Sequence, residues 1–502
     1  MPLWGRLAIL AVTLFGGVLR FWRLDRPHLL VFDETYYVKE GWSMFKAGYE
    51  LKWAGEGKVV DPKWNAGDVN VFTGDPEFVV HPPVGKWMIG AGEWIFGPTS
   101  SWGWRFSAAL VGTVSILMLA LIARRLFDST LLGVIAGLLL AVDGEHFVHS
   151  RTGLLDIFVM FWALASFGCL LIDRDHGRRR LAERIADRNE RGLPLGVLGP
   201  GLGLRWWRVA AAVCLGLTIG TKWSGLYIAA VFGVMAVCWD ISARRAAGLR
   251  HWFVAAVLRD GLLAVVVMAP VALAVYLASW TGWFLSDNAY DRAWAADHPS
   301  AHFGWVPGAL RGLWFYQTQM YQSSISISVR HPFQSNPWSW LVMGRPTAFY
   351  LQSPKLGEKG CKVAQCSEAI TALGNPVIWW GATLAIGVLL FQWALRRDWR
   401  AGAVLAGIIA GYLPWFLYQE RTIFNFYSIV FTPWVVLALT YVIGMMLGPP
   451  GQSEKRRKRG AIAAGAVVVV AVLTFWFFLP VYSAQVIPQT SWADRMWLPS
   501  WF

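Results

Sequence analysis

Long uncharged, apolar runs recur from one end of the chain to the other, and they constrain its fold more than any other feature. Eleven such runs stand between charged residues, at positions 7–19, 106–123, 129–142, 157–172, 209–221, 223–239, 261–286, 369–395, 401–419, 422–447 and 460–482. A helix that crosses the hydrocarbon core of a bilayer needs about 20 residues of this kind. The chain is also only 15% charged, whereas soluble domains are about 25% charged. We therefore expect an all-α integral membrane protein with about eleven spanning helices.

Basic residues cluster after every even-numbered run. Arg124 and Arg125 follow the second run, for example, and the basic segment 455–459 follows the tenth. The short connections on the other side carry one basic residue each, namely Arg151, Lys222 and Arg421. Cytoplasmic loops are enriched in Lys and Arg, so we expect the N-terminus inside the cell and the C-terminus outside. This asymmetry accounts for the net charge of +14, and we expect no nucleic-acid partner.

We expect a single transmembrane domain over residues 1–482, followed by an extracytoplasmic tail at 483–502. Two long loops on the outer side interrupt this domain, at 23–105 and 281–368. Within the first loop, residues 84–96 form an amphipathic stretch that we expect to lie in the membrane interface. The first run resembles a signal peptide in its short apolar core, but no Ala-x-Ala cleavage site follows it.

The second outer loop contains Cys361 and Cys366. The exterior of a cell is oxidising, so we expect these two residues to form a local disulfide, and two free thiols are the alternative. The remaining cysteines fall in apolar runs, where we expect them to act as packing residues.

Ionisable residues bracket three runs that are too short to cross a membrane alone. The third run has 14 uncharged residues before Asp143, the fourth has 16 after Asp156, and the fifth has 13 before Lys222. A charge at the bilayer centre costs roughly 2.5–3.5 kcal/mol, so these groups either pair with one another or line a wet cavity. A structural salt-bridge network is one interpretation. The other is a cavity for an anionic group, because three basic residues map to the outer ends of runs, namely Arg105, Arg151 and Lys222.

Two adjacent acids, Asp33 and Glu34, follow the first run in an aromatic, β-prone setting. A carboxylate in this position is a candidate general base. In an extended strand the two side chains would point to opposite sides, so we expect only one of them to face a substrate. Later in the same loop, two prolines stiffen the chain between His81 and Lys86. These two residues either contribute to a site at the mouth of the interfacial helix or form a structural elbow with a snorkelling Lys.

Several segments resemble the protein O-mannosyltransferase family, in its bacterial, actinobacterial-type branch, and they follow one another along nearly the whole chain. They are 32–34 (Phe-Asp-Glu), 81–86 (His-Pro-Pro-Val-Gly-Lys), 143–156 with its Ser150 and Arg151, 220–225 (Gly-Thr-Lys-Trp-Ser-Gly), 331–340 (His-Pro-Phe-Gln-Ser-Asn-Pro-Trp-Ser-Trp), and 413–415 (Leu-Pro-Trp) with Arg421 and Tyr427. Eukaryotic members carry a β-trefoil domain in the second outer loop, and the loop of this chain is too short to hold one.

The resemblance implies a GT-C glycosyltransferase fold and inverting transfer of mannose from polyprenyl phosphate mannose to Ser or Thr residues of secreted or membrane proteins. It places the reaction on the outer face of a bacterial plasma membrane. By the family motif, Asp33 matches the catalytic acidic residue, and we expect Glu34 to orient a neighbour or to hold the acceptor. The donor phosphate gains negative charge as its bond to the sugar breaks, so we expect two or three cations to contact it, drawn from Arg105, Lys222, Arg151, Lys86 and Arg421. We expect His81, Asp143 and Asp156 to support this site.

We expect no obligatory metal, because the cations can take the place of a divalent ion and the sequence has no metal-ligand spacing. The expected partners are the lipid-linked donor, a polypeptide with Ser or Thr residues, and membrane lipids, with the protein-export translocon as a candidate neighbour. Two alternatives stay open. One is a GT-C transferase that moves another prenyl-linked sugar to a lipid or glycan, and the more remote one is a lipid transporter or flippase. Transporters usually show repeated halves, and we find no internal repeat.

Overall fold

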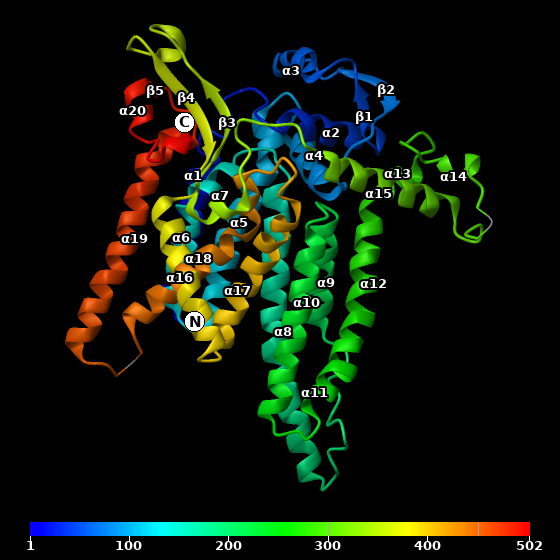
Figure 1. Ribbon diagram of the computed structural model, residues 1–502, viewed down its shortest axis with the longest axis vertical. Helices are drawn as coiled ribbons and strands as arrows, with labels where there is room; N and C mark the ends of the chain where they lie inside the picture. Colours follow the sequence, from blue (N-terminus) through cyan, green and yellow to red (C-terminus); the bar gives the residue numbers. More distant parts are fainter. Residues whose placement is uncertain (301, 450) are drawn as a thin grey trace.

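Long helices form the body of the molecule in the computed structural model, which describes residues 1–300, 302–449 and 451–502 (Figure 1). Within these residues, nine helical segments are long and apolar enough to cross a membrane. They contain α1 (Leu3–Phe21), α5 (Ser101–Phe127), α8 (Asp156–Glu190), α10 (Gly225–Ala246), α11 (Trp252–Ala255) joined to α12 (Leu262–Ser279), α16 (Pro376–Ala394), α17 (Trp399–Tyr412), α18 (Thr432–Leu447) and α19 (Glu454–Tyr482). The chain is therefore a mostly helical, multi-pass membrane protein.

Two of the predicted runs form shorter helices. They are α6 (Thr130–Ala141), which packs against α1 and α5, and α9 (Trp206–Ile219), which packs against α8 and α12. All eleven predicted runs thus contain helix, and the number that cross the membrane stays a prediction. Some predicted boundaries are wrong, because residues 369–372 belong to a strand and a separate short helix, α13 (Thr281–Leu285), follows α12.

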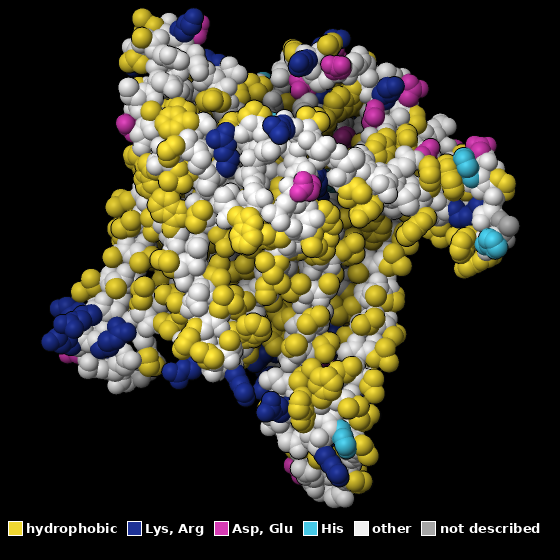
Figure 2. Space-filling view, viewed as in Figure 1, with side chains coloured by type: hydrophobic (Ala, Val, Ile, Leu, Met, Phe, Trp, Pro, Cys, Tyr) yellow, Lys and Arg dark blue, Asp and Glu magenta, His cyan; other side chains and the backbone are white. Residues whose placement is uncertain are grey.

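The two ends of the helix bundle differ in charge. The long loops and the C-terminus lie at one end, and the N-terminus lies toward the other (Figure 1). Lys and Arg side chains gather at the end opposite the long loops, where α19 begins and where α8 extends beyond its neighbours (Figure 2). This distribution agrees with the predicted orientation, in which the basic end faces the cytoplasm.

The first outer loop folds into three helices and a two-stranded sheet. These are α2 (Glu34–Ala47), β1 (Leu51–Trp53), α3 (Gly57–Asn65), β2 (Phe72–Pro76) and α4 (Val84–Phe96). Strands β1 and β2 are antiparallel, with Trp53 opposite Phe72. The predicted interfacial stretch forms α4, which packs against α2 and α5 and leaves Trp94, Ile95 and Phe96 exposed. The helices of this loop therefore pack over the outer ends of the spans.

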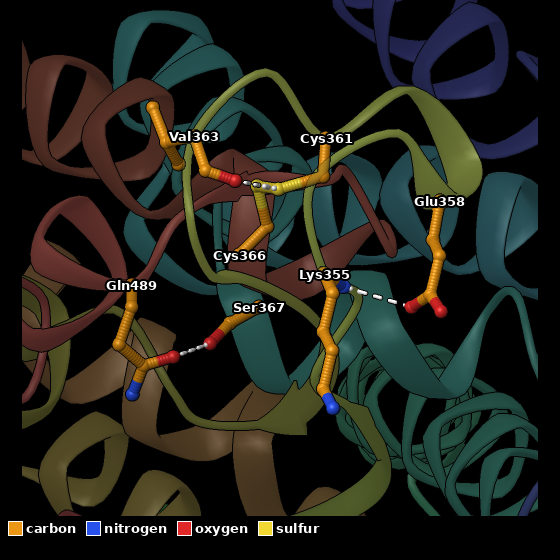
Figure 3. Close-up of a disulfide and its surroundings, with 7 residues drawn as sticks. All are labelled: Lys355, Glu358, Cys361, Val363, Cys366, Ser367 and Gln489. Atoms are coloured by element: carbon orange, nitrogen blue, oxygen red, sulfur yellow. Dashed lines mark hydrogen bonds between the residues drawn. A yellow bond between two sulfur atoms is a disulfide. The ribbon is translucent and has the colours of Figure 1, made fainter.

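The second outer loop contains helices α13, α14 (Trp294–Asp297) and α15 (Gly308–Ser326), followed by strands β3 (Thr347–Gln352) and β4 (Cys366–Ala372). Cys361 and Cys366 are disulfide-bonded at the tip of the β3–β4 hairpin (Figure 3). The short strands show that the all-α prediction holds for the membrane part only.

Residues 483–502, predicted as an extracytoplasmic tail, pack against the second outer loop. Their strand β5 (Ile487–Pro488) pairs with β4 and extends the sheet to the order β3–β4–β5, and α20 (Gln489–Ala493) follows. Ser367 donates a hydrogen bond to Gln489 beside the disulfide (Figure 3). Arg345 binds the carbonyl of Ser500 at 2.7 Å. The end of the chain thus becomes part of the second outer loop, through contacts between residues far apart in sequence.

Candidate functional site

Arg151 caps the outer, C-terminal end of α1. Its Nη1 donates to the carbonyls of Arg20 at 2.8 Å and of Trp22 at 2.6 Å, and its Nη2 donates to the carbonyl of Arg23 at 2.9 Å. The last carbonyls of a helix lack partners within the helix, so a buried guanidinium is a suitable cap for them. Arg151 is 6% exposed. The structure thus engages Arg151 with backbone carbonyls, and its contact with an anion stays a prediction.

A bidentate ion pair between Arg105 and Glu34 lies beside this cap. The Nε and Nη2 atoms of Arg105 reach the two carboxylate oxygens of Glu34 at 2.8 Å each. Its remaining N–H groups donate to three backbone carbonyls of the chain that leaves α1, those of Leu24, Pro27 and Leu29. A guanidinium has five N–H donors, and all of them are engaged here. The structure thus engages every donor of Arg105 within the protein, and a contact with phosphate stays a prediction.

Glu34 is fully buried and has further partners besides Arg105. It accepts hydrogen bonds from the N–H groups of Val31 at 3.0 Å and Gly153 at 2.8 Å. It thereby joins the first outer loop to the turn before α8. These contacts hold the chain in place, and the role of Glu34 toward a substrate stays a prediction.

Asp33 stands between two anchored residues. Phe32, which precedes it, has φ of 49°, a left-handed conformation that costs a non-glycine residue roughly 1–2 kcal/mol. The Phe32 ring stacks on Phe349 of β3 with centroids 4.7 Å apart and lies edge-on to Phe426 at 5.3 Å. Glu34 is fixed on the other side, so the backbone at Asp33 has little freedom. Asp33 is the helical cap of α2, so the pair is not in an extended strand.

Asp33 is half-buried, and within the described residues its carboxyl accepts no side-chain or capping hydrogen bond. Burial raises its pKa to about 6, an effect that the Lys222 ammonium opposes and the Asp156 carboxylate reinforces. A carboxylate with this pKa accepts a proton readily near neutral pH. Asp33 therefore has the geometry and the basicity of a proton acceptor.

Lys222 and Asp156 form an ion pair next to Asp33. The Nζ atom of Lys222, in the turn before α10, lies 2.8 Å from Oδ2 of Asp156, the first residue of α8. It also lies 5.5 Å from the ring centroid of Tyr427. Lys222 has three donors, and only one of them is engaged by a side chain in the described residues. The other donors can bind an anion.

Arg421 is the second cation at this position. It is partly exposed, and its side chain has no hydrogen-bond or ion-pair partner among the described residues. Its positive charge is close enough to Tyr427 and to His81 for electrostatic interaction with both side chains. The Tyr427 ring, which lies beside the Lys222 ammonium, stacks on Trp415 with centroids 4.6 Å apart. Of the five cations that the sequence offered for an anion, the structure leaves Lys222 and Arg421 available.

Lys86 and His81 lie on the side of the site formed by the first loop. Lys86 is fully buried, with Nζ 2.5 Å from Glu50 and 3.6 Å from Glu40, so two carboxylates neutralise it and its contact with phosphate stays a prediction. Burial holds the pKa of His81 well below its usual value, and Lys222, Lys86 and Arg421 lower it further. His81 is therefore neutral at physiological pH and is available as a hydrogen-bonding group.

Asp143 supports the fold and not the anion site. Its Oδ1 accepts the N–H of His146 at 2.9 Å, and its Oδ2 accepts from Asn375 at 3.1 Å and from the Trp379 indole at 3.0 Å. It caps the short helix α7 (Gly144–His149) and ties it to α16. Sequence reasoning placed Asp143 near the outer surface but did not identify these partners.

Sequence reasoning also missed residues that shape the site. Phe349 and Phe426 hold Phe32, and Glu40 and Glu50 neutralise Lys86. No local pattern marks these residues, because each acts on a partner that is distant in sequence or on another element.

The chain matches known families over most of its length. Residues 10–181 match the model for dolichyl-phosphate-mannose-protein mannosyltransferase, and residues 309–501 match the model for the C-terminal four TMM region of protein-O-mannosyltransferase. The polyprenol-phosphate-mannose–protein mannosyltransferase of Mycolicibacterium smegmatis (strain MKD8) is 36% identical, over 99% of this chain and 93% of the relative. The corresponding protein of Corynebacterium glutamicum is 32% identical with the same coverage.

Solved structures show the fold. The S. cerevisiae protein O-mannosyltransferase Pmt1-Pmt2 complex bound to the sugar donor superposes with a TM-score of 0.73 at 12% identity, over 100% of this chain and 93% of that chain. The oligosaccharyltransferase AglB from Archaeoglobus fulgidus superposes with a TM-score of 0.53 at 15% identity, over 98% of this chain and 57% of that chain. The chain therefore has the GT-C fold.

The ion pair between Arg105 and Glu34 yields a stability prediction. Arg105→Met or Glu34→Gln leaves a buried group without its partner, and breaking such a pair costs about 3–5 kcal/mol. We expect residues 22–36 to lose protection in hydrogen–deuterium exchange in either variant, while the spanning helices keep theirs. The double variant should lose less than the sum of the two.

A surface pair provides the matched control. Arg125 and Asp175 are 35% and 32% exposed, and such pairs contribute no more than about 1 kcal/mol. Arg125→Met should therefore leave exchange unchanged. Normal protection of residues 22–36 in Arg105→Met would show that the pair does not hold this loop.

Proposed function

Because the chain belongs to the polyprenol-phosphate-mannose–protein mannosyltransferase family, we propose that it transfers mannose from polyprenyl phosphate mannose to hydroxyl groups of Ser and Thr residues in proteins. The position of Asp33 is the observation that assigns this function to particular residues. Its carboxyl is close enough to the Lys222 ammonium for that positive charge to lower the pKa of Asp33. The charges of Lys222 and Arg421 both lower the pKa of His81. A base and two available cations therefore meet at one site.

The acceptor hydroxyl is a weak nucleophile, so it must lose its proton during the attack. We assign this proton to Asp33. The hydroxyl oxygen then forms a bond to C1 of mannose while the bond from C1 to the phosphate oxygen breaks on the opposite face. A single displacement of this kind inverts the configuration at C1, and the polyprenyl phosphate leaves with the bonding electron pair.

The leaving group needs cations more than it needs an acid. A phosphate monoester has a second pKa near 6, so it departs with little protonation. Its charge changes from −1 toward −2, and cations that bind the more charged state better lower the barrier. We assign this stabilisation to Lys222 and Arg421, and we assign to His81 and Asp156 the orientation of the groups around them.

The proposed site lies on the extracytoplasmic face of the plasma membrane. The basic ends of the helices are opposite the long loops that hold Asp33 (Figure 2), and basic ends face the cytoplasm. The disulfide between Cys361 and Cys366 is on the same side as Asp33 and is of a kind that persists in oxidising compartments. Polypeptide acceptors that emerge from the protein-export translocon would meet the site on this face.

The first prediction concerns the base. Asp33→Asn should lower transfer to a Ser/Thr-rich peptide by roughly 10²–10⁴-fold, because general base catalysis contributes a factor of that size. In the wild type, kcat/KM should fall about tenfold per pH unit below about pH 6, where the carboxyl carries a proton and cannot accept another.

The control is Asp68→Asn, which removes an exposed carboxylate from the same loop and should leave the rate unchanged. Transfer that persists in Asp33→Asn would remove Asp33 from the mechanism. Label that reaches membrane lipid instead of peptide in the wild type would favour the alternative transferase, in which a lipid or glycan is the acceptor.

The second prediction concerns the free cation. Arg421→Gln should lower kcat/KM for the donor by roughly 10–100-fold, because a hydrogen bond to a charged group contributes about 1.5–3 kcal/mol. The KM for the peptide should change little, and Arg421→Lys should recover part of the loss. Lys355→Gln removes an exposed cation from the second loop and is the matched control. A raised KM for the peptide, or an unchanged kcat/KM for the donor, would show that Arg421 does not act on phosphate.

The third prediction concerns metal ions. Two cations beside the phosphate can supply the charge that a divalent ion would otherwise provide. We therefore propose that no divalent ion is required and expect full transfer in excess EDTA with radiolabelled donor. Activity that is lost on chelation and restored by Mg²⁺ or Mn²⁺ would contradict this.

A further inference from the structure

The second outer loop begins with an arm that leaves the bundle sideways. Helices α13, α14 and α15 extend beyond the outer end of α12 (Figure 1). One face of α15 is buried, through Leu313, Tyr316 and Met320. On this face Tyr316 accepts a hydrogen bond from the N–H of Val79 at 3.1 Å. The arm is thus a packed part of the molecule.

A second face of α15 is apolar and largely exposed among the described residues, although Tyr321 on this face also contacts Trp223. Its large exposed side chains are Leu310, Trp314, Tyr321 and Ile325, which are 38%, 72%, 46% and 41% exposed. At 3.6 residues per turn these four positions fall within about 60° of one another, so they form a single stripe. The rest of the arm adds three more exposed apolar side chains, Leu285, Phe303 and Trp305. The only charged residue of α15 is Arg311, so the stripe has no competing charges.

The helix that leads into the arm faces lipid. Of the nine candidate spans in the described residues, the one that ends in α12 is the least buried, with 17% of its apolar window inside the protein. Trp280 is the only residue between α12 and α13. Apolar side chains continue from α12 onto the arm (Figure 2). The stripe on the arm is therefore continuous with a surface that lies in the bilayer.

We propose that this arm lies in the headgroup region of the outer leaflet, with the stripe of Leu310, Trp314, Tyr321 and Ile325 turned toward the acyl chains. Trp and Tyr are enriched at this depth of a membrane. Helices with an apolar face and few charges lie in the interface in this way. The occupant of the stripe is lipid, and a second copy of the chain is the alternative that the experiment must exclude.

The arm also touches both sides of the site. Tyr321 stacks on Trp223, the residue after Lys222, with centroids 6.4 Å apart. Tyr316 binds Val79, two residues before His81. Lipid contact along the arm therefore sets the height of Lys222 and His81 above the membrane, where the phosphate of a prenyl donor lies. This consequence rests on the proposed function, whereas the position of the arm in lipid does not.

The position of the arm can be measured without any activity. The full-length chain, with Ser in place of Cys169, Cys214 and Cys238, is reconstituted into vesicles of phosphatidylethanolamine and phosphatidylglycerol. A nitroxide is attached to Trp314→Cys or, as matched control, to Gln322→Cys, an exposed polar position of the same helix. We expect the label at 314 to be accessible to oxygen and protected from a water-soluble nickel chelate, and the label at 322 to show the reverse.

Two results would overturn the proposal. Equal access of the nickel chelate to both labels would place the arm in water. Protection of the label at 314 from both reagents, with spin–spin broadening between copies, would identify a protein partner in place of lipid.

The effect on transfer distinguishes a lipid contact from a general structural role. The variant Trp305→Gln/Trp314→Gln loses the apolar surface of two large side chains and should raise the KM for a long-chain prenyl donor in vesicles roughly tenfold. Turnover of a short-chain, water-soluble donor should stay unchanged, as should both donors in Gln322→Ala. An equal loss with both donors, or no loss with either, would overturn the link between the arm and the site. If the wild type transfers nothing, the proposed function fails while the labelling result still stands.

Discussion

Glu34 and Arg105 form an ion pair that water does not reach, and the outer end of the protein is arranged to satisfy it. Two oxygens and five N–H donors are all engaged, and the carbonyls that complete the set come from the chain between α1 and α2. A buried pair of this kind tolerates little displacement, because either charge alone would cost several kcal/mol. The position of Asp33 follows from this constraint, because Glu34 fixes the neighbouring backbone and so keeps Asp33 close to Lys222.

The cost of burying a charge near a membrane explains why some of the cations are paired within the protein and others are available for binding. Arg105, Arg151 and Lys86 are buried, and each has enough acceptors around it to offset the loss of water. Arg105 has no N–H group left to offer a substrate, and Arg151 and Lys86 are held by partners within the protein. Lys222 and Arg421 keep partial exposure and unused donors, so an arriving phosphate would gain contacts without breaking the fold. The same physics that makes most intramembrane charges structural thus identifies the two that are available for binding.

The membrane helices and the position of Asp33 were predictable because their signals are local in sequence. The length of an apolar run and the basic residues beside it depend on neighbours within about 20 residues. The roles of the cations depend on distant partners, as when Arg151 meets carbonyls of residues 20–23 or Lys86 meets Glu50. The strand β5 was missed for the same reason, because its partner β4 lies more than a hundred residues earlier. Sequence could therefore place five cations near the outer surface but could not separate the capping ones from the free ones.

The contact between Phe32 and Phe349 joins the two outer loops at the site. Phe32 adopts a left-handed conformation that it would leave without support, and the Phe349 ring supplies that support from β3. Strand β3 pairs with β4, which is held by the disulfide at one end and by β5 from the end of the chain. The second loop therefore supports Asp33 from outside, while Glu34 and Arg105 support it from within the bundle. A carboxylate held from two directions needs little reorganisation when a substrate arrives, which is the condition under which the proposed base and its two cations would lower a barrier most.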